Sequence, residues 1–106
     1  MKKFEIDPEI PSIIGGMFHQ DTLYIYPDIA DAILADLEVS SQHELQLLVT
    51  FCNELLTGGY TADERFDLWL KAGIEDGEFM FDDESLIAVL EFMRTNYSAE
   101  LKRRFG

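Results

Sequence analysis

The sequence lacks positive charge over most of its length. From Phe4 to Glu64 it contains no lysine and no arginine, although the same stretch carries twelve aspartates and glutamates. The whole chain of 106 residues has twenty-one acidic residues and eight basic ones, and five of the basic residues lie close to the two ends. Nucleic acids and anionic membranes are bound through clustered lysine and arginine, so neither is an expected partner.

The uncompensated negative charge has two interpretations. A folded body with this much charge repels itself and loses some stability, which is easiest to understand if the negative field attracts a basic protein. The alternative is that the acidity only keeps the protein soluble. Charge alone does not choose between them.

Other features are also scarce. Cys52 is the single cysteine, so no internal disulfide is possible, which fits a reducing cytoplasm. No apolar run follows Lys2 and Lys3, as a secretory signal would require. No stretch approaches the roughly eighteen apolar residues of a membrane span. We therefore expect a cytoplasmic protein.

The apolar residues that are present have helical spacing. Hydrophobic residues make up 47% of the chain, and thirteen aromatics are among them, so one domain over residues 1–106 can bury a core. We predict an all-α fold, a compact bundle of five to six short helices, with residues 1–8 as an extended arm. The expected helices cover 8–19, 28–39 with Asp28 as N-cap, 41–58, 61–73, and 83 to about 97, with a final short turn to Phe105 capped by Ser98.

Local signals mark several of these boundaries. Ser41 with Glu44, and Thr61 with Glu64, have the spacing of capping boxes. Gly58-Gly59 is expected to close the helix between them. Residues 20–27 indicate a short extended segment, and residues 74–83 an acidic loop. The aromatic residues expected in the core are Phe66, Trp69, Phe79, Phe81, Phe92 and Tyr97. Phe79 and Phe81 lie in the acidic loop, where one of them could instead anchor a partner.

No catalytic, metal or cofactor site is predicted. His19 and Asp21 could form an acid–base or metal pair, but no nucleophile and no further ligands accompany them, so a structural role is expected. Residues 75–84 do not have the ligand spacing of a calcium-binding loop. Cys52 lies on an apolar stripe and is expected to be a small buried hydrophobe.

One segment resembles a known family. The run Ile10-Pro11-Ser-Ile-Ile-Gly-Gly-Met-Phe-His-Gln-Asp21 is similar to the opening of immunity proteins from bacterial contact-dependent growth inhibition systems, in which an apolar segment precedes Gly-(Gly/Ala)-aromatic-Phe-His-Gln-Asp. The helix order that follows is also similar, over about ninety residues in all. The sequence departs from that pattern at Met17 and again over residues 22–27.

The resemblance implies a small helical protein that is not an enzyme and that binds and blocks the C-terminal toxin domain of a contact-delivered effector, commonly a nuclease. Because nucleases carry basic clefts, the charge argument points to the same class of partner. Loops often carry function, so we predict that contacts come from the acids and aromatics of irregular segments. The candidates are Asp21, Tyr24, Tyr26, Asp28, Asp31, Glu75, Asp76, Glu78, Phe79, Asp82 and Asp83.

Two other functions stay open at this point. The chain could be an acidic adaptor or regulatory domain that binds another basic protein, or a small hydrolase that uses His19 and Asp21. An effector gene immediately upstream would favour the immunity function, whereas a different gene neighbourhood would favour the adaptor. The oligomeric state is not predicted.

Overall fold

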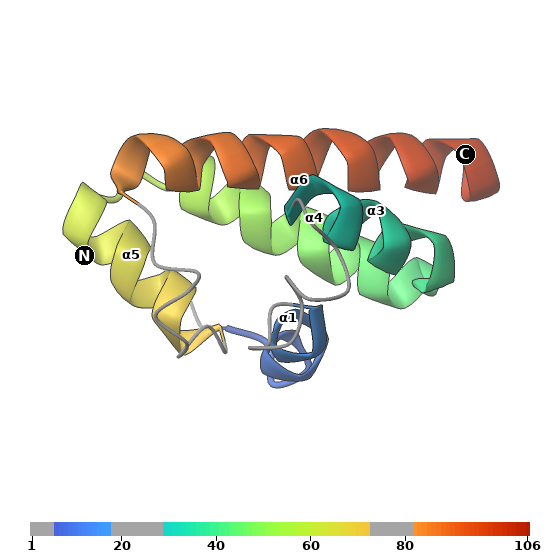
Figure 1. The fold of residues 1–106 in the computed structure, drawn as a ribbon, viewed down its shortest axis with the longest axis horizontal. Helices are drawn as coiled ribbons and strands as arrows, with labels where there is room; N and C mark the ends of the chain where they lie inside the picture. Colours follow the sequence, from blue (N-terminus) through green and yellow to red (C-terminus); the bar gives the residue numbers. More distant parts are fainter. Residues whose placement is uncertain (1–5, 18–28, 73–81) are drawn as a thin grey trace.

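The computed structural model describes residues 6–17, 29–72 and 82–106, and these residues form five helices and no strand. The helices are α1 (Ile10–Met17), α3 (Ile29–Val39), α4 (Gln42–Thr57), α5 (Ala62–Lys71) and α6 (Asp83–Phe105). α4 and α6 run antiparallel, side by side, and form the most extensive contact (Figure 1). α3 packs on α6, α1 packs against α3 and α4, and α5 packs against the first part of α6 (Figure 1). The predicted all-α globule is confirmed.

The ends of α4 and α5 form as their local sequences predict. The Ser41 hydroxyl accepts a hydrogen bond from the Glu44 amide at 3.2 Å, and the Glu44 carboxylate accepts one from the Ser41 amide at 3.0 Å. Thr61 and Glu64 exchange the same pair of bonds, at 3.2 and 2.9 Å. Gly59, just after the cap of α4, has a φ of 79°, a conformation that favours glycine. Both capping-box predictions are confirmed.

The core lies between the apolar stripes of the helices. Its fully buried side chains include Leu45, Leu48, Phe51, Cys52 and Leu55 of α4, Leu86, Leu90, Met93 and Tyr97 of α6, and Trp69, Ile10, Ile14 and Ile33 of the other helices. Val49 and Leu56 also have the helical spacing of the apolar stripe of α4, from which burial is expected, but both are only half-buried. Phe51 is buried instead, because α1 covers that side of α4.

Four of the six aromatics expected in the core fall in the described residues. Trp69 and Tyr97 are fully buried, while Phe66 and Phe92 are half-buried and pack against the core. Phe79 and Phe81 lie outside the described residues.

The end of α6 differs from the prediction. We expected Ser98 to cap a separate final turn, but α6 is one continuous helix of 23 residues, so the helices are not all short. Ser98 is an exposed residue inside this helix, and no glycine or proline follows it before Gly106. Ion pairs from Glu100 to Arg103 and Arg104 span the last turns and favour continued helix.

Several boundary predictions lie partly outside the described residues. α1 begins at Ile10, and the turn before it includes residues 8 and 9. The predicted extended segment 20–27 and the Asp28 N-cap fall outside, as does most of the predicted acidic loop 74–83. α5 ends at Lys71, two residues before the predicted stop at Gly73, with Ala72 as its C-cap.

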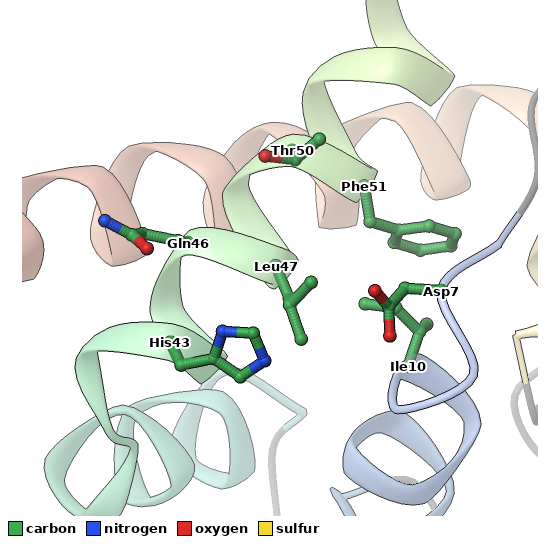
Figure 2. A pocket seen from close by; sticks show the side chains of 7 residues that line it. All are labelled: Asp7, Ile10, His43, Gln46, Leu47, Thr50 and Phe51. Atoms are coloured by element: carbon green, nitrogen blue, oxygen red, sulfur yellow. The ribbon is translucent and has the colours of Figure 1, made fainter.

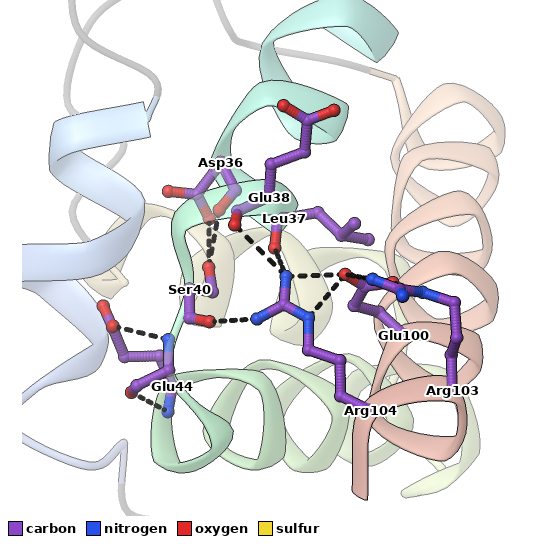
Figure 3. A network of polar contacts seen from close by, with 9 residues as sticks. Asp36, Leu37, Glu38, Ser40, Glu44, Glu100, Arg103 and Arg104 are labelled. Carbon is purple, nitrogen blue, oxygen red and sulfur yellow. Dashed lines mark hydrogen bonds and ion pairs between the residues drawn. The ribbon is translucent and has the colours of Figure 1, made fainter.

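Arg104 joins the end of α6 to the end of α3 (Figure 3). Its guanidinium donates to the carbonyls of Ser40 and Leu37, each at 2.8 Å, and to Glu100 at 2.6 Å. The last carbonyls of a helix have no partner within that helix. Arg104 therefore acts as a C-cap for α3, supplied by a different helix.

Arg65 has a corresponding role at the opposite end of the α4–α6 pair. Its guanidinium donates to the Leu55 carbonyl at 3.0 Å, to the Tyr60 carbonyl at 3.1 Å and to the Asp83 carboxylate at 2.7 Å. These bonds hold the end of α4, the turn into α5 and the start of α6 together.

We expect Arg104→Met to lower the free energy of unfolding by about 2–3 kcal/mol, because it leaves several α3 carbonyls without a partner and removes one of the two arginines bonded to Glu100. Arg103→Met is the matched control. Arg103 also pairs with Glu100, but its side chain is 69% exposed and reaches no α3 carbonyl, so its loss is expected to destabilise the fold much less. Urea unfolding measures both, and equal losses would contradict the capping role.

Glu100 predicts a pH dependence of stability. Its bonds to Arg103, and then those to Arg104, lower the pKa of the Glu100 carboxyl from 4.5 to about 2. Because the folded-state pKa is the lower one, this carboxylate stabilises the fold above pH 4.5, and the contribution disappears as the pH falls towards 2. The difference in unfolding free energy between the wild type and Glu100→Gln should therefore be present at neutral pH and shrink over that window. A difference that does not change with pH would refute this.

Candidate interaction surface

Nearly all the positive charges in the described residues are already engaged within the molecule. Arg65 and Arg104 hold helix ends, as above, and Arg103 pairs with Glu100. Lys71 pairs with Asp67 at 2.8 Å, and Arg94 donates to Asn53 at 3.3 Å. The scarce cations therefore do little to neutralise the rest of the surface.

Several carboxylates, by contrast, face solvent without compensation. Their side chains are exposed and have no ion-pair or hydrogen-bond partner among residues 6–17, 29–72 and 82–106: these are Asp31, Glu38, Asp63, Glu84 and Glu91. The negative charge of the sequence is therefore displayed on the outside of the fold, where it can act on another molecule.

Several acidic groups lie where α4 ends and α5 and α6 begin. We call this region the acidic end; its carboxylates are Glu54, Asp63, Glu64, Asp82, Asp83 and Glu84. The three helix ends meet at one side of the molecule (left in Figure 1), and Arg65 links all of them. The first turns of helices favour acidic residues, and the Arg65–Asp83 bond brings two such turns together.

The opposite end of α6 has the opposite sign. Lys102, Arg103 and Arg104 form its last turn, while Asp83 and Glu84 lie in its first. Both placements complement the helix dipole. α6 therefore begins at the acidic end and finishes in a basic turn, so negative and positive side chains are separated along its axis.

Three of the predicted contact residues can be located. Asp82 is the N-cap of α6, and its carboxylate accepts a hydrogen bond from the Ser85 amide at 2.8 Å. Hydrogen bonding to the Ser85 side chain, and then to the Ser85 amide, lowers the pKa of Asp82. Asp83 accepts from Arg65 at the acidic end. Asp31 is exposed in the first turn of α3, a helix that takes no part in the acidic end.

The remaining candidate contacts lie outside the described residues, and their predicted role stays a prediction. They are Asp21, Tyr24, Tyr26, Asp28, Glu75, Asp76, Glu78 and Phe79. His19, the other half of the possible acid–base pair, also lies outside.

Sequence reasoning missed a partly buried carboxylate between α3 and α6. Asp36 accepts a hydrogen bond from the Tyr97 hydroxyl at 3.1 Å and a longer one from the Ser40 hydroxyl at 3.3 Å. Burial raises the pKa of Asp36. Asp36 follows Ile29 and Ile33 at helical spacing, so its place on an apolar stripe could have predicted a partly buried carboxylate. Both partners are hydroxyls that hold it in place, which indicates a structural role.

A groove between α1 and α4 was also not predicted (Figure 2). Its volume is about 360 Å³, and its lining residues are Asp7, Ile10, His43, Gln46, Leu47, Thr50 and Phe51. The imidazole of His43, at the edge of the groove, lies 3.2 Å from the Glu9 carboxylate. The two walls lie more than thirty positions apart in the sequence, so periodicity within either helix does not reveal the groove.

Chemically reactive groups are scarce in the described part of the chain. It contains no group of three or more histidine, cysteine, aspartate or glutamate side chains that could hold a metal ion. Burial raises the pKa of the Cys52 thiol to about 12, so the thiol stays protonated and is a poor nucleophile. Among these same residues, no helix is long and apolar enough to cross a membrane.

Comparisons of the chain with protein-family models, with curated proteins and with solved structures find no match. The resemblance to immunity proteins therefore stays a prediction from the residues between Ile10 and Asp21.

We expect Cys52 to be unreactive towards dithionitrobenzoate in the folded protein at pH 8, because it is fully buried and its pKa is raised to about 12. In urea the same thiol should react to completion within minutes. Absorbance of the released thiolate measures both states. Rapid stoichiometric labelling of the folded protein would show that the thiol is accessible and ionisable.

Proposed function

We propose that this chain is an immunity protein, which binds a basic toxin domain of a contact-dependent growth inhibition effector and neutralises it. The observation that carries the proposal is the acidic end, where carboxylates gather around one arginine that is already bonded within the fold. A cationic protein surface is the partner that such a region attracts.

The acidic end has physical properties that suit an inhibitor. Glu64 is held by a capping box, Asp82 by the amide of Ser85 and Asp83 by Arg65, so their side chains are ordered before a partner arrives. Ordering in advance reduces the entropy lost on binding. Asp63 and Glu84 remain exposed beside them. Together these anions can occupy a basic cleft in place of a phosphate backbone, so a nuclease is the class of toxin that fits best.

Neutralisation of this kind needs no chemistry from the inhibitor. Occupying or covering the toxin's cleft is enough, and the inhibitor need only match that surface in shape and charge. The proposed role is therefore binding and not catalysis, with a place of action in the cytoplasm, where a delivered toxin would meet its target. The similarity of the segment Ile10 to Asp21 to the opening of immunity proteins supports the same proposal.

The proposal predicts that a gene next to this one encodes an effector, and it is tested with the purified C-terminal domain of that effector. We expect nanomolar binding or tighter, with an association rate constant that falls several-fold as salt rises from about 50 to about 200 mM. The double variant Asp63→Asn with Glu84→Gln should slow association about threefold or more at low salt, because it removes two exposed charges of the acidic end.

Glu38→Gln with Glu91→Gln is the matched control. It also removes two exposed carboxylates without described partners, but neither lies at the acidic end. Stopped-flow fluorescence or surface plasmon resonance gives the rates. Absence of binding by the wild type would refute the immunity function, and an association rate indifferent to salt and to both double variants would refute the role of the acidic end.

A further inference from the structure

We infer that the groove between α1 and α4 receives an arginine side chain of the basic partner. This inference rests on the proposed function and adds to it a specific site and a chemical group. The acidic end attracts a cationic surface as a whole, whereas the groove would hold one defined side chain.

The groove combines an apolar floor with one inward-facing charge. Ile10, Leu47 and Phe51 supply the apolar part. The Asp7 carboxylate points into the hollow beside Ile10 and Leu47 (Figure 2). One Asp7 oxygen accepts a hydrogen bond from the Glu9 amide at 2.9 Å, and the other has no hydrogen-bond partner within the described ranges.

The apolar floor and the Asp7 carboxylate together determine which side chain fits the groove. An aliphatic side chain would cover the floor but would leave a desolvated carboxylate oxygen unpaired, which is unfavourable. An anion would be repelled by Asp7 and Glu9. An arginine has a methylene stem that packs on apolar surface and a planar head with several donors for a carboxylate. Among the residues that the structure describes, the lining of the groove includes no lysine or arginine that could already serve as this partner.

The position of the groove agrees with binding by one partner. Leu47 at the groove and Glu54 at the acidic end belong to α4, seven residues apart. That separation is about 10 Å along a helix axis. A typical interface covers about 800 Å² on each partner, which is enough to include both sites. A toxin domain attracted to the acidic end can therefore place an arginine in the groove.

The chemistry of the groove is tested with the full-length ¹⁵N-labelled chain and two small probes, N-acetyl-arginine amide and N-acetyl-norleucine amide. We expect saturable shifts of the Leu47 and Thr50 amide signals, with at least threefold tighter binding of the arginine probe. Asp7→Asn should remove this preference, because it deletes the charge and keeps an oxygen acceptor for the Glu9 amide. Asp67→Asn, on an exposed aspartate of α5, should leave the preference intact.

Three results would overturn the inference: no saturable shift, equal binding of the two probes, or a preference that survives Asp7→Asn in a folded variant. If the same signals shift when the protein alone is concentrated, a second copy of the chain fills the groove, and the assignment to a partner's arginine is also wrong.

The toxin domain provides the second arm. Thr50→Arg places the chain's own guanidinium at the groove and should weaken binding about tenfold, while Thr95→Arg makes the same change on an exposed threonine of α6 and should not. If the wild type binds and both variants bind equally well, the groove is not used and the immunity function stands. If the wild type does not bind, the proposed function fails, and the assignment of the groove's occupant fails with it.

Discussion

The antiparallel packing of α4 on α6 is the contact on which the rest of the structure depends. These two helices contribute nine of the core's fully buried side chains, and α3 and α5 pack on α6 while α1 packs on α4. An arginine secures each end of the pair: Arg65 at the start of α6 and Arg104 at its end. The other three helices are positioned by this frame, and so are the acidic end and the groove.

Scarcity of cations explains how the fold and the surface are related. A chain with a formal charge of −13 repels itself, so each internal bond to a guanidinium offsets part of that repulsion. The arginines satisfy backbone carbonyls and a few carboxylates at helix ends, where bonding groups would otherwise lack partners. As a consequence, little positive charge is left to screen the outer carboxylates. The use of arginines inside the fold both stabilises it and leaves the surface negative.

The sequence predicted the features that depend on neighbouring residues. The capping boxes at Ser41 and Thr61 form because their bonds span three positions, and the apolar stripes identified the helices and most of the core. Ser98 misled because a serine can start a helix but does not stop one, and what continues α6 is its side-chain pairing and packing.

The candidate site was less predictable. The sequence alone predicted the acidity of the chain and named Asp82 and Asp83 as candidate contacts. The acidic end, however, assembles through Arg65, which bonds to groups five, ten and eighteen positions away in the sequence. The groove needs α1 to dock on α4, and the position of Asp36 needs α3 to dock on α6. Tertiary packing of this kind cannot be predicted from the hydrophobic periodicity of a single segment. Most of the predicted loop contacts lie outside the described residues and stay predictions.

The cap that Arg104 supplies to α3 has a consequence for the order of events during synthesis. The two partners are 64 to 67 positions apart, so α3 leaves the ribosome long before the group that completes its last turn. Closing so long a loop carries an entropic cost that only the packing of α6 can offset. We therefore expect the nascent chain to hold α3 with a frayed end until α6 has emerged, which makes the docking of this helix one of the last steps of maturation.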